Sequence, residues 1–362
     1  MIGIHNNPGS FSDRWLETCR QRLLPFKLVD CLASDVIQQC SGLSAVLWHW
    51  SHNQISELLI ARQVLTALRA NGLLVFPTVE SSWHYDDKIA QKYLLEAIGA
   101  PLVPTWLFLD PQQAQNWIAQ ATWPKVFKLR CGAGSNNVSL VNSRRQAEAL
   151  CAKAFGTGFA TQPGYFYDLK RRSRSAGNWT AWLQKLRRAP RSFLAVWQRR
   201  RTLPRQRSYA YFQEFLPGND FDTRITVIGN RAFGFRRMNR AGDFRASGSG
   251  QLLLSPDAVD PRAVQIAFAV AQRLASRSMA FDFLQDTQGK PCITEISYCY
   301  VAAAVHQCPG HWDPQLTWHP GQVWPQDAIL DDVLQDLANN PPRNAPGGSP
   351  KPGSVHLQTL PL

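Results

Sequence analysis

Residues 211–250 place charged side chains inside apolar strand-like runs, and this feature constrains the fold more than any other. The apolar residues of 225–235 flank Gly229 and Asn230, a pair typical of a tight hairpin turn. Because like charges repel strongly where water is scarce, clustered arginines on strands require an anion between them. We expect that anion to be a phosphate. The charged residues on this predicted platform are Asp222, Arg224, Arg236 and Arg237.

Length and composition limit the class of protein. A chain of 362 residues with 44% hydrophobic content can bury a substantial core and should divide into two or three subdomains. It is too long and too apolar for a peptide hormone or a disordered tail. The eight cysteines lack a disulfide-framework spacing, which indicates reduced thiols. No apolar run reaches the roughly 18 residues of a membrane span, and no signal peptide is evident, so we expect a soluble cytoplasmic protein.

The net charge of +13 is concentrated in residues 168–207, where Asp168 is the only acid among many lysines and arginines. Tryptophan, leucine and phenylalanine recur among them at roughly helical spacing, which predicts a basic amphipathic helix. Its positive face suits a polyanion or an anionic membrane surface, or is simply a solvated surface. Specific nucleic-acid binding is not expected, because no nucleic-acid-binding fold signature accompanies the segment.

Residues 1–84 alternate short apolar strands with amphipathic helices, as in a small doubly wound sheet. Ligands of such sheets lie beyond the carboxyl ends of the strands, here the loops 5–10 and 49–53. The first loop lacks the glycine fingerprint of a dinucleotide site. The two loops are therefore either substrate loops or ordinary connections.

Two lysines precede features that suit phosphate. Lys88 lies in the first turn of a predicted helix, where the helix dipole disfavours a cation unless an anion is bound nearby. Lys128 ends an apolar strand and is followed by a glycine-rich turn at 132–137, whose backbone amides could close over phosphates. A surface lysine and a plain hairpin are the alternative interpretations of these two segments.

Two acidic residues stand on adjacent predicted strands. Asp282 and Glu295 flank a turn at 286–289, and each has apolar neighbours. Paired carboxylates in a buried sheet raise each other's pKa unless a cation lies between them. A small number of oxygen ligands beside a phosphate site favours magnesium.

In order and spacing, these residues resemble the ATP-grasp superfamily. The similarity covers roughly residues 1–335 and is most specific over 211–297. It is closest to the branch of ribosomal-protein glutamate ligases and glutathione synthetases, and it extends to ATP-grasp proteins of surface-polysaccharide modification. The motifs that carry it are Lys88, Lys128 with its glycine loop, Gln213-Glu214-Phe215-Leu216, Asp222-Thr223-Arg224, Arg237, Asp243-Phe244-Arg245, Asp282 and Glu295.

The resemblance implies a fold of mixed α/β and α+β class. It places a Rossmann-like domain at 1–84, a connecting helix and linker at 85–120, a lid domain at 121–210 and a catalytic α+β domain at 211–337. Residues 168–207 would be a basic insertion in the lid. The Pro- and Gly-rich residues 338–362 are expected to be a disordered tail.

The resemblance also implies roles for individual residues. The cofactors would be ATP and Mg²⁺ or Mn²⁺. The phosphates would be held by Lys88, Lys128, Gly132, Gly134 and Ser135, the adenine by Gln213, Glu214, Phe215 and Leu216, and the ribose by Asp222. The residues facing the transferred phosphoryl group or the acceptor would be Arg224, Arg237 and Arg245, and the metal ligands Asp282, Glu295 and Ser297. Ser297 departs from the asparagine usual at its position, which puts a second metal site in question.

The implied reaction is ATP-dependent formation of a C–N bond between a carboxylate and an amine through an acyl phosphate. We expect an acidic substrate, either a uronate-containing glycan or a peptide, attracted by the basic segment. Surface-polysaccharide biosynthesis and a peripheral position at the inner face of the membrane fit that segment, and a homo-oligomer is compatible with the sequence. The alternatives are a phosphotransferase using the same nucleotide site and a catalytically weakened nucleotide-binding protein. Tyr298, Tyr300, Trp312 and Trp318 form either a sugar-stacking wall or part of the core.

Overall fold

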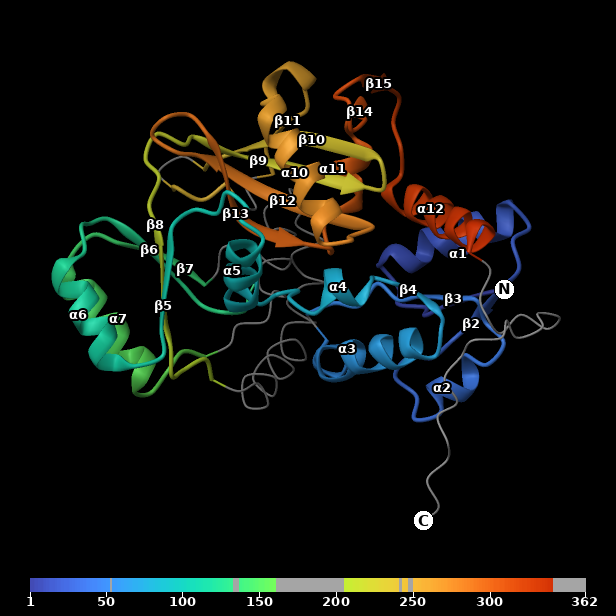
Figure 1. Ribbon diagram of the computed structural model, residues 1–362, viewed down its shortest axis with the longest axis horizontal. Helices are drawn as coiled ribbons and strands as arrows, with labels where there is room; N and C mark the ends of the chain where they lie inside the picture. The colour runs from blue at the N-terminus through green and yellow to red at the C-terminus, as the bar shows by residue number, and fades with distance from the viewer. Residues whose placement is uncertain (53, 133–136, 161–204, 241–242, 247–249, 341–362) are drawn as a thin grey trace, which may run out of the picture.

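A computed structural model describes residues 1–52, 54–132, 137–160, 205–240, 243–246 and 250–340. Three sheets with flanking helices make up this part of the chain (Figure 1). The predicted mixed α/β and α+β class is confirmed. No helix in the described ranges is long and apolar enough to cross a membrane. All eight cysteines are free, as their irregular spacing predicted.

The first sheet is parallel, with strand order β2-β1-β3-β4. Ser10 caps the first helix by accepting a hydrogen bond from the Ser12 amide, which satisfies one of the free amides at the helix start. The alternation of strands and helices predicted for this region is therefore present. The elements are β1 (Ile2–Ile4), α1 (Phe11–Gln21), β2 (Phe26–Leu28), α2 (Val36–Gln39), β3 (Ala45–Leu47), α3 (Ile55–Ala70), β4 (Leu74–Phe76) and the short α4 (Val79–Ser82).

The second sheet is antiparallel, with strand order β5-β8-β6-β7. Two helices cover one of its faces and lie side by side in Figure 1. Phe127 and Phe212 pack with Ala114 and Ile118 of the helix α6 (Pro111–Gln120) in a separate core. The elements are α5 (Lys88–Ala97), β5 (Thr105–Phe108), α6 (Pro111–Gln120), β6 (Lys125–Lys128), β7 (Val138–Val141), α7 (Arg144–Phe155) and β8 (Ala210–Glu214).

The chain leaves and re-enters this second sheet region at a single β-bridge. Phe159 and Gln206 face each other in antiparallel fashion, with backbone hydrogen bonds of 2.8 and 2.9 Å. Residues 161–204, which include most of the predicted basic insertion, lie outside the described residues. The described residues on either side of that stretch are therefore neighbours in space.

The third sheet has strand order β13-β12-β9-β10-β14-β15, and β11 pairs with β10. Both predicted hairpins are present, one turning at Gly229-Asn230 and the other at residues 286–290. The elements are β9 (Phe221–Ile228), β10 (Arg231–Met238), β11 (Leu252–Leu253), η1 (Pro256–Ala258), α10 (Pro261–Arg273), β12 (Ser278–Gln285), β13 (Pro291–Ser297), α11 (Ala302–His306), β14 (Gly310–Trp312), β15 (Trp318–Pro320) and α12 (Pro325–Asn339).

Side chains alternate across the third sheet, so residues one position apart along a strand point to opposite faces. Ile225, Val227 and Phe281 pack in one core with apolar residues of α10. Side chains one residue away in register project from the other face, and these include Arg224 and Asp282, which are direct partners across β9 and β12. Asp222, Arg224 and Arg237 of the predicted platform therefore lie on the face turned away from α10, which also carries the buried Phe235, whereas Arg236 points to the opposite face.

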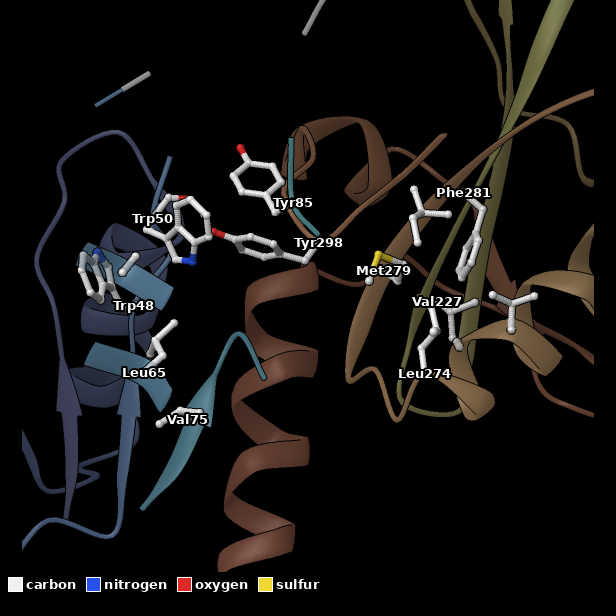
Figure 2. Close-up of a cluster of buried hydrophobic side chains, with 14 of the residues drawn as sticks. Trp48, Trp50, Leu65, Val75, Tyr85, Val227, Leu274, Met279, Phe281 and Tyr298 are labelled. Carbon is white, nitrogen blue, oxygen red and sulfur yellow. The ribbon is translucent and has the colours of Figure 1, made fainter. Parts of the chain in front are cut away.

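An aromatic cluster joins the first sheet to the third. Figure 2 shows Trp48 and Trp50, which follow β3, beside Tyr85 and Tyr298. The rings of Tyr85 and Tyr298 lie 4.6 Å apart, and Tyr298 donates a hydrogen bond to the Trp50 carbonyl. Tyr298 and Tyr300 are buried, so these two residues belong to the core and do not form a sugar-stacking wall.

Candidate functional site

The first residue of α5 connects the second and third sheets. The Lys88 Nζ donates to Glu295 Oε1 on β13 and to the Gly132 carbonyl after β6, both at 3.1 Å. The Lys88 backbone amide also donates to the Arg130 carbonyl. Burial disfavours the charged ammonium, but Glu295 and Asp86 outweigh this effect and raise the pKa of Lys88. Lys88 is therefore a fixed cation at this junction.

Lys128 is a second buried cation at the same junction, and it differs from Lys88 in having no partner in the part of the chain that the structure describes. It ends β6 and is 8% exposed. Within the described ranges its ammonium makes no hydrogen bond and no ion pair, although Glu295, Lys88 and Asp282 all act on it electrostatically. Burial lowers the pKa of Lys128 to about 8 despite the two carboxylates. A buried ammonium without a partner is a site for an anion.

Four charged side chains form a ladder across β9, β10 and β12. Arg224 donates two hydrogen bonds to Asp282, at 2.7 and 2.8 Å. Arg237 donates two to Asp222, both at 2.6 Å, and also pairs with Asp282 at 2.8 Å. The ladder, defined as Arg224, Asp282, Arg237 and Asp222, carries no net charge. It places two of the predicted phosphoryl-facing arginines beside a predicted metal ligand.

The ladder corrects one step of the sequence argument. Arg224 and Arg237 do not need a phosphate to balance them in this structure, because Asp222 and Asp282 already do so. Likewise, protein cations relieve the expected repulsion between Asp282 and Glu295. Burial would raise the pKa of Asp282, but Arg224 and Arg237 outweigh burial and hold it well below its usual range. Arg236 lies apart from the ladder, with its guanidinium 4.0 Å from the Phe221 ring.

The predicted metal ligands offer the oxygen donors that magnesium prefers, but not a preformed cage. Asp282 and Glu295 are direct cross-strand partners, so both carboxylates lie on the same face. No group of three or more His, Cys, Asp or Glu side chains in the described ranges is placed to hold a metal. Ser297 Oγ donates to the Cys299 carbonyl at 2.8 Å. Two carboxylates completed by substrate phosphates and water would fit magnesium, provided that Asp282 leaves its arginines.

The predicted adenine-binding residues lie at the end of β8, in the middle of the second sheet. Gln213 is buried and donates to the Thr105 hydroxyl at 3.1 Å. Glu214 accepts from Lys125 Nζ at 2.9 Å. Phe215 packs edge-on against Phe244, and Leu216 is buried. Gln213 and Glu214 end β8, and Phe215 and Leu216 begin the connection to β9.

The structure describes only some of the remaining predicted site residues. Arg245 is held by Asp243 through two 2.8 Å hydrogen bonds, and its Nη1 lies 3.5 Å from the Val138 carbonyl on β7. Gly132 begins the glycine loop and is in contact with Lys88. Gly134 and Ser135 lie outside the described residues.

Sequence reasoning overlooked two charged residues that contact predicted site residues. Lys125 is buried on β6 and forms the ion pair with Glu214. Asp86 accepts a 2.7 Å hydrogen bond from the Gly132 amide. A lysine inside an apolar strand was a detectable signal for the first. The second had none, because Asp86 precedes Asp87 and looks like part of an ordinary helix cap.

The loops predicted to meet a substrate are tied together by Glu57. This carboxylate is fully buried and accepts from the Ser51 amide at 2.6 Å and from Asn7 Nδ2 at 3.0 Å. His5 Nε2 lies 4.0 Å from it. The loops 5–10 and 49–52 therefore share one anchor at the carboxyl end of the first sheet, and Asn53 lies outside the described residues.

A cavity of about 830 Å³ lies away from these charges. It is lined by residues at the turn end of β9 and β10 and by β4, α10 and α12, and it includes none of the predicted site residues. Its arginines are already paired, for example Arg231 with Asp332 at 3.0 Å. The junction of Lys88, Lys128 and the ladder, although less hollow, is the better candidate for chemistry.

Comparison with known proteins identifies the fold of this chain. No family model matches the sequence, and no curated protein matches it significantly. Solved structures do match. A RimK-domain ATP-grasp protein from Sphaerobacter thermophilus aligns with a TM-score of 0.54 at 14% identity, over 92% of this chain and 99% of that one. The chain has the ATP-grasp fold.

Two further ATP-grasp structures agree over the same extent. D-cycloserine synthetase DcsG aligns with a TM-score of 0.54 at 14% identity, covering 92% of this chain and 99% of its own. The ATP-grasp ligase PsnB, solved with a minimal precursor, gives 0.52 at 13%, covering 92% and 98%. At such low identity the likeness is one of ATP-grasp fold. Substrate and reaction have to be argued from this chain's own residues.

Proposed function

We propose that this chain is an ATP-dependent ligase that joins a carboxylate to an amine through an acyl phosphate. The observation that carries the proposal is the buried ammonium of Lys128, which has no hydrogen-bond or ion-pair partner among the described residues and lies beside Lys88 and the ladder. Three separate segments of an ATP-grasp fold bring these charges together. A triphosphate supplies the anion that Lys128 lacks and, for Arg224 and Arg237, an alternative to their carboxylate partners.

The proposed chemistry depends on position and charge. A substrate carboxylate oxygen attacks the γ-phosphorus in line, the bond to the β–γ bridging oxygen breaks, and ADP leaves. The amine then attacks the acyl carbon, inorganic phosphate leaves with the bonding electrons, and the amine loses a proton to solvent. Lys88, Lys128 and the two ladder arginines would neutralise and orient the phosphates during both steps. Asp282 and Glu295 would hold Mg²⁺, which supplies further neutralisation of phosphate charge.

We propose an acidic acceptor, either a peptide or a uronate-containing glycan. PsnB, which shares the fold, was solved with a precursor peptide, and the net charge of +13 favours an anionic partner. Charge reversal of Arg199, Arg200 and Arg201, which lie outside the described residues, should weaken acceptor binding more than ATP binding. The loss should shrink at high salt. Equal losses for both ligands would mean that these arginines do not select the acceptor.

The test of the reaction is product analysis. The protein is incubated with ATP, amino acids and a panel of uronic acids and acidic peptides, and the products are identified by mass spectrometry. An amide with one ADP per bond supports the ligase, whereas a stable phosphoester would indicate a phosphotransferase. Asp282→Asn and Glu295→Gln should abolish turnover with unchanged circular dichroism. Turnover retained in both variants would remove the metal assignment.

One observation favours a second candidate, a nucleotide-binding protein with weak or no turnover. The Ser297 hydroxyl donates to the Cys299 carbonyl and accepts from the Cys299 amide, so it is engaged within its own turn. ATP binding without turnover for every acid and amine would support this candidate. Restored turnover in Ser297→Asn would identify the residue responsible.

A further inference from the structure

Asp86 has a backbone conformation that side chains rarely adopt. Its φ is +54°, in the left-handed region, which only glycine enters freely and aspartate and asparagine tolerate best. It lies between Tyr85, in the aromatic cluster, and the cap of α5. The helix cap itself is Asp87, which accepts from the Ile89 and Ala90 amides. Asp86 therefore is not needed to cap the helix.

The carboxylate of Asp86 is used on the glycine loop instead. Its Oδ1 accepts the Gly132 amide hydrogen at 2.7 Å, while Lys88 Nζ donates to the Gly132 carbonyl at 3.1 Å. Two side chains from one end of α5 thus hold both polar groups of a single residue. The Lys88 amide adds a third hydrogen bond, to the Arg130 carbonyl at 2.9 Å.

Gly132 is constrained on its remaining side as well. Its φ is +123°, and a Cβ at this position would collide with the Asn137 side chain. Asn137 Nδ2 in turn donates to the Cys131 carbonyl at 2.7 Å. The point from which the chain continues into residues 133–136 is therefore fixed by groups on both sides, and the strongest of them, a carboxylate, comes from outside the second sheet.

We propose that Asp86 is a positioning residue for nucleotide binding, which fixes the orientation of the Gly132 amide after β6. This inference rests on the proposed function, because it concerns the ATP site. A glycine loop can present its amides to phosphates only if its first peptide units are oriented, and a hydrogen bond to a charged acceptor is a strong way to fix one. Asp86 acts through Gly132 and need not touch the nucleotide.

The test uses the full-length protein and two substitutions with opposite chemistry. Asp86→Gly accepts the left-handed backbone without strain but removes the carboxylate, so the fold should survive. Asp86→Asn tolerates the same backbone and keeps an oxygen that can accept the Gly132 amide. Asp110→Ala is the matched control, since Asp110 also accepts one backbone amide, that of Gln113 at 2.8 Å, at the start of α6.

The measurements are the Kd of Mg·AMP-PNP by calorimetry, amide hydrogen exchange over residues 130–132, and the melting temperature. We expect Asp86→Gly to weaken nucleotide binding by about tenfold or more and to speed exchange at Gly132. Asp86→Asn should stay within about threefold of wild type, and Asp110→Ala should bind nucleotide normally. The melting temperature of Asp86→Gly should fall no further than that of the control.

The outcomes separate the two claims. Wild-type nucleotide affinity in Asp86→Gly would overturn the positioning role while leaving the ligase proposal standing. A wild-type protein that binds no nucleotide would overturn both. A collapse in melting temperature of Asp86→Gly and Asp86→Asn alike would show that Asp86 is needed for folding rather than for orienting the loop.

Discussion

Arg224 on β9 and Asp282 on β12 stand directly opposite each other and share two hydrogen bonds, of 2.7 and 2.8 Å. Mg²⁺ arriving alone would have to displace the guanidinium and leave two arginines beside a dication. ATP arriving alone would have to take the arginines from Asp222 and Asp282, and its phosphates would then lie beside carboxylates that no cation neutralises. We therefore expect neither Mg²⁺ nor ATP to bind well without the other. Mg²⁺ binding to Asp282 frees the arginines for the phosphates, and phosphate binding to the arginines frees Asp282 for Mg²⁺.

Calorimetric titration tests this exchange of partners. Mg²⁺ without nucleotide and ATP with a chelator should both give little heat, whereas Mg·ATP should bind. Arg224→Gln removes the guanidinium that donates two hydrogen bonds to Asp282. This variant should therefore gain affinity for Mg²⁺ in the absence of nucleotide. Tight Mg²⁺ binding by the unliganded wild type would contradict the interpretation.

Removal of one ladder carboxylate should destabilise the protein in the absence of ligand. Asp282→Asn leaves Arg224 without its charged partner and Arg237 with only one, in a largely buried setting. We expect the free energy of unfolding to fall by about 3 kcal/mol, measured by urea denaturation. Asp260→Asn is the control, because Asp260 pairs with the exposed Arg262, and its effect should stay within about 0.5 kcal/mol. Similar losses in both variants would show that the ladder is no more important than a surface pair.

Nucleotide binding should be accompanied by proton uptake at Lys128. Its pKa of about 8 means that about half of the free protein carries a neutral amine at pH 8. A bound triphosphate favours the ammonium, so binding at pH 8 should take up about half a proton, and less at pH 7. The measurement compares binding enthalpies in buffers of different ionisation enthalpy. Lys128→Met should abolish the uptake. Lys88, whose pKa is raised, should contribute none.

Two buried histidines predict a loss of stability in mild acid. Burial lowers the pKa of His49 from 6.5 to about 3 and that of His84 to about 4. Between about pH 6.5 and 4 the unfolded chain binds protons that the folded chain does not, so stability present above pH 6.5 falls as the pH falls. Each histidine contributes a slope of up to about 1.4 kcal/mol per pH unit.

Urea denaturation at pH 7, 6 and 5 measures that slope above the range in which most carboxylates titrate. His49→Gln and His84→Gln should each flatten it, because glutamine does not titrate. Neither ring nitrogen of either histidine has a side-chain hydrogen-bond partner in the described ranges, and burial outweighs the nearby charge of Asp87, which favours protonated His84. An unchanged slope in the double variant would assign the acid sensitivity to other groups.

The sequence was most informative where the signal is local. Gly229-Asn230 between apolar runs predicted the β9–β10 hairpin, and the charges inside those runs include three of the four ladder residues. The partner of each charge could not be predicted in the same way. Asp282 meets Arg224 because of strand register across β9 and β12, and register depends on the packing of the whole sheet. We expected a phosphate between the arginines because the sequence did not reveal that Asp222 and Asp282 pair with them.

Two other features depend on contacts between segments that are far apart in the chain, so the sequence did not determine them. Tyr298 follows a predicted metal strand, and the sequence left open whether it stacks on a ligand or belongs to the core. Its contacts with Trp50 and Tyr85 place it in the core. The left-handed backbone of Asp86 is favoured by its contact with Gly132, which lies 46 residues further along the chain. Local sequence carries no information about such contacts.

The bridge between Phe159 and Gln206 has a consequence for how such a protein can diversify. Because these two residues already face each other, β8 keeps its place between β5 and β6 whatever the length of chain joined across the bridge. We therefore expect the second sheet to stay closed when a short connector replaces residues 161–204. Under the proposed function, recognition of a new acceptor could then be acquired by joining a different segment across this bridge, without changes at Lys88, Lys128 or the ladder.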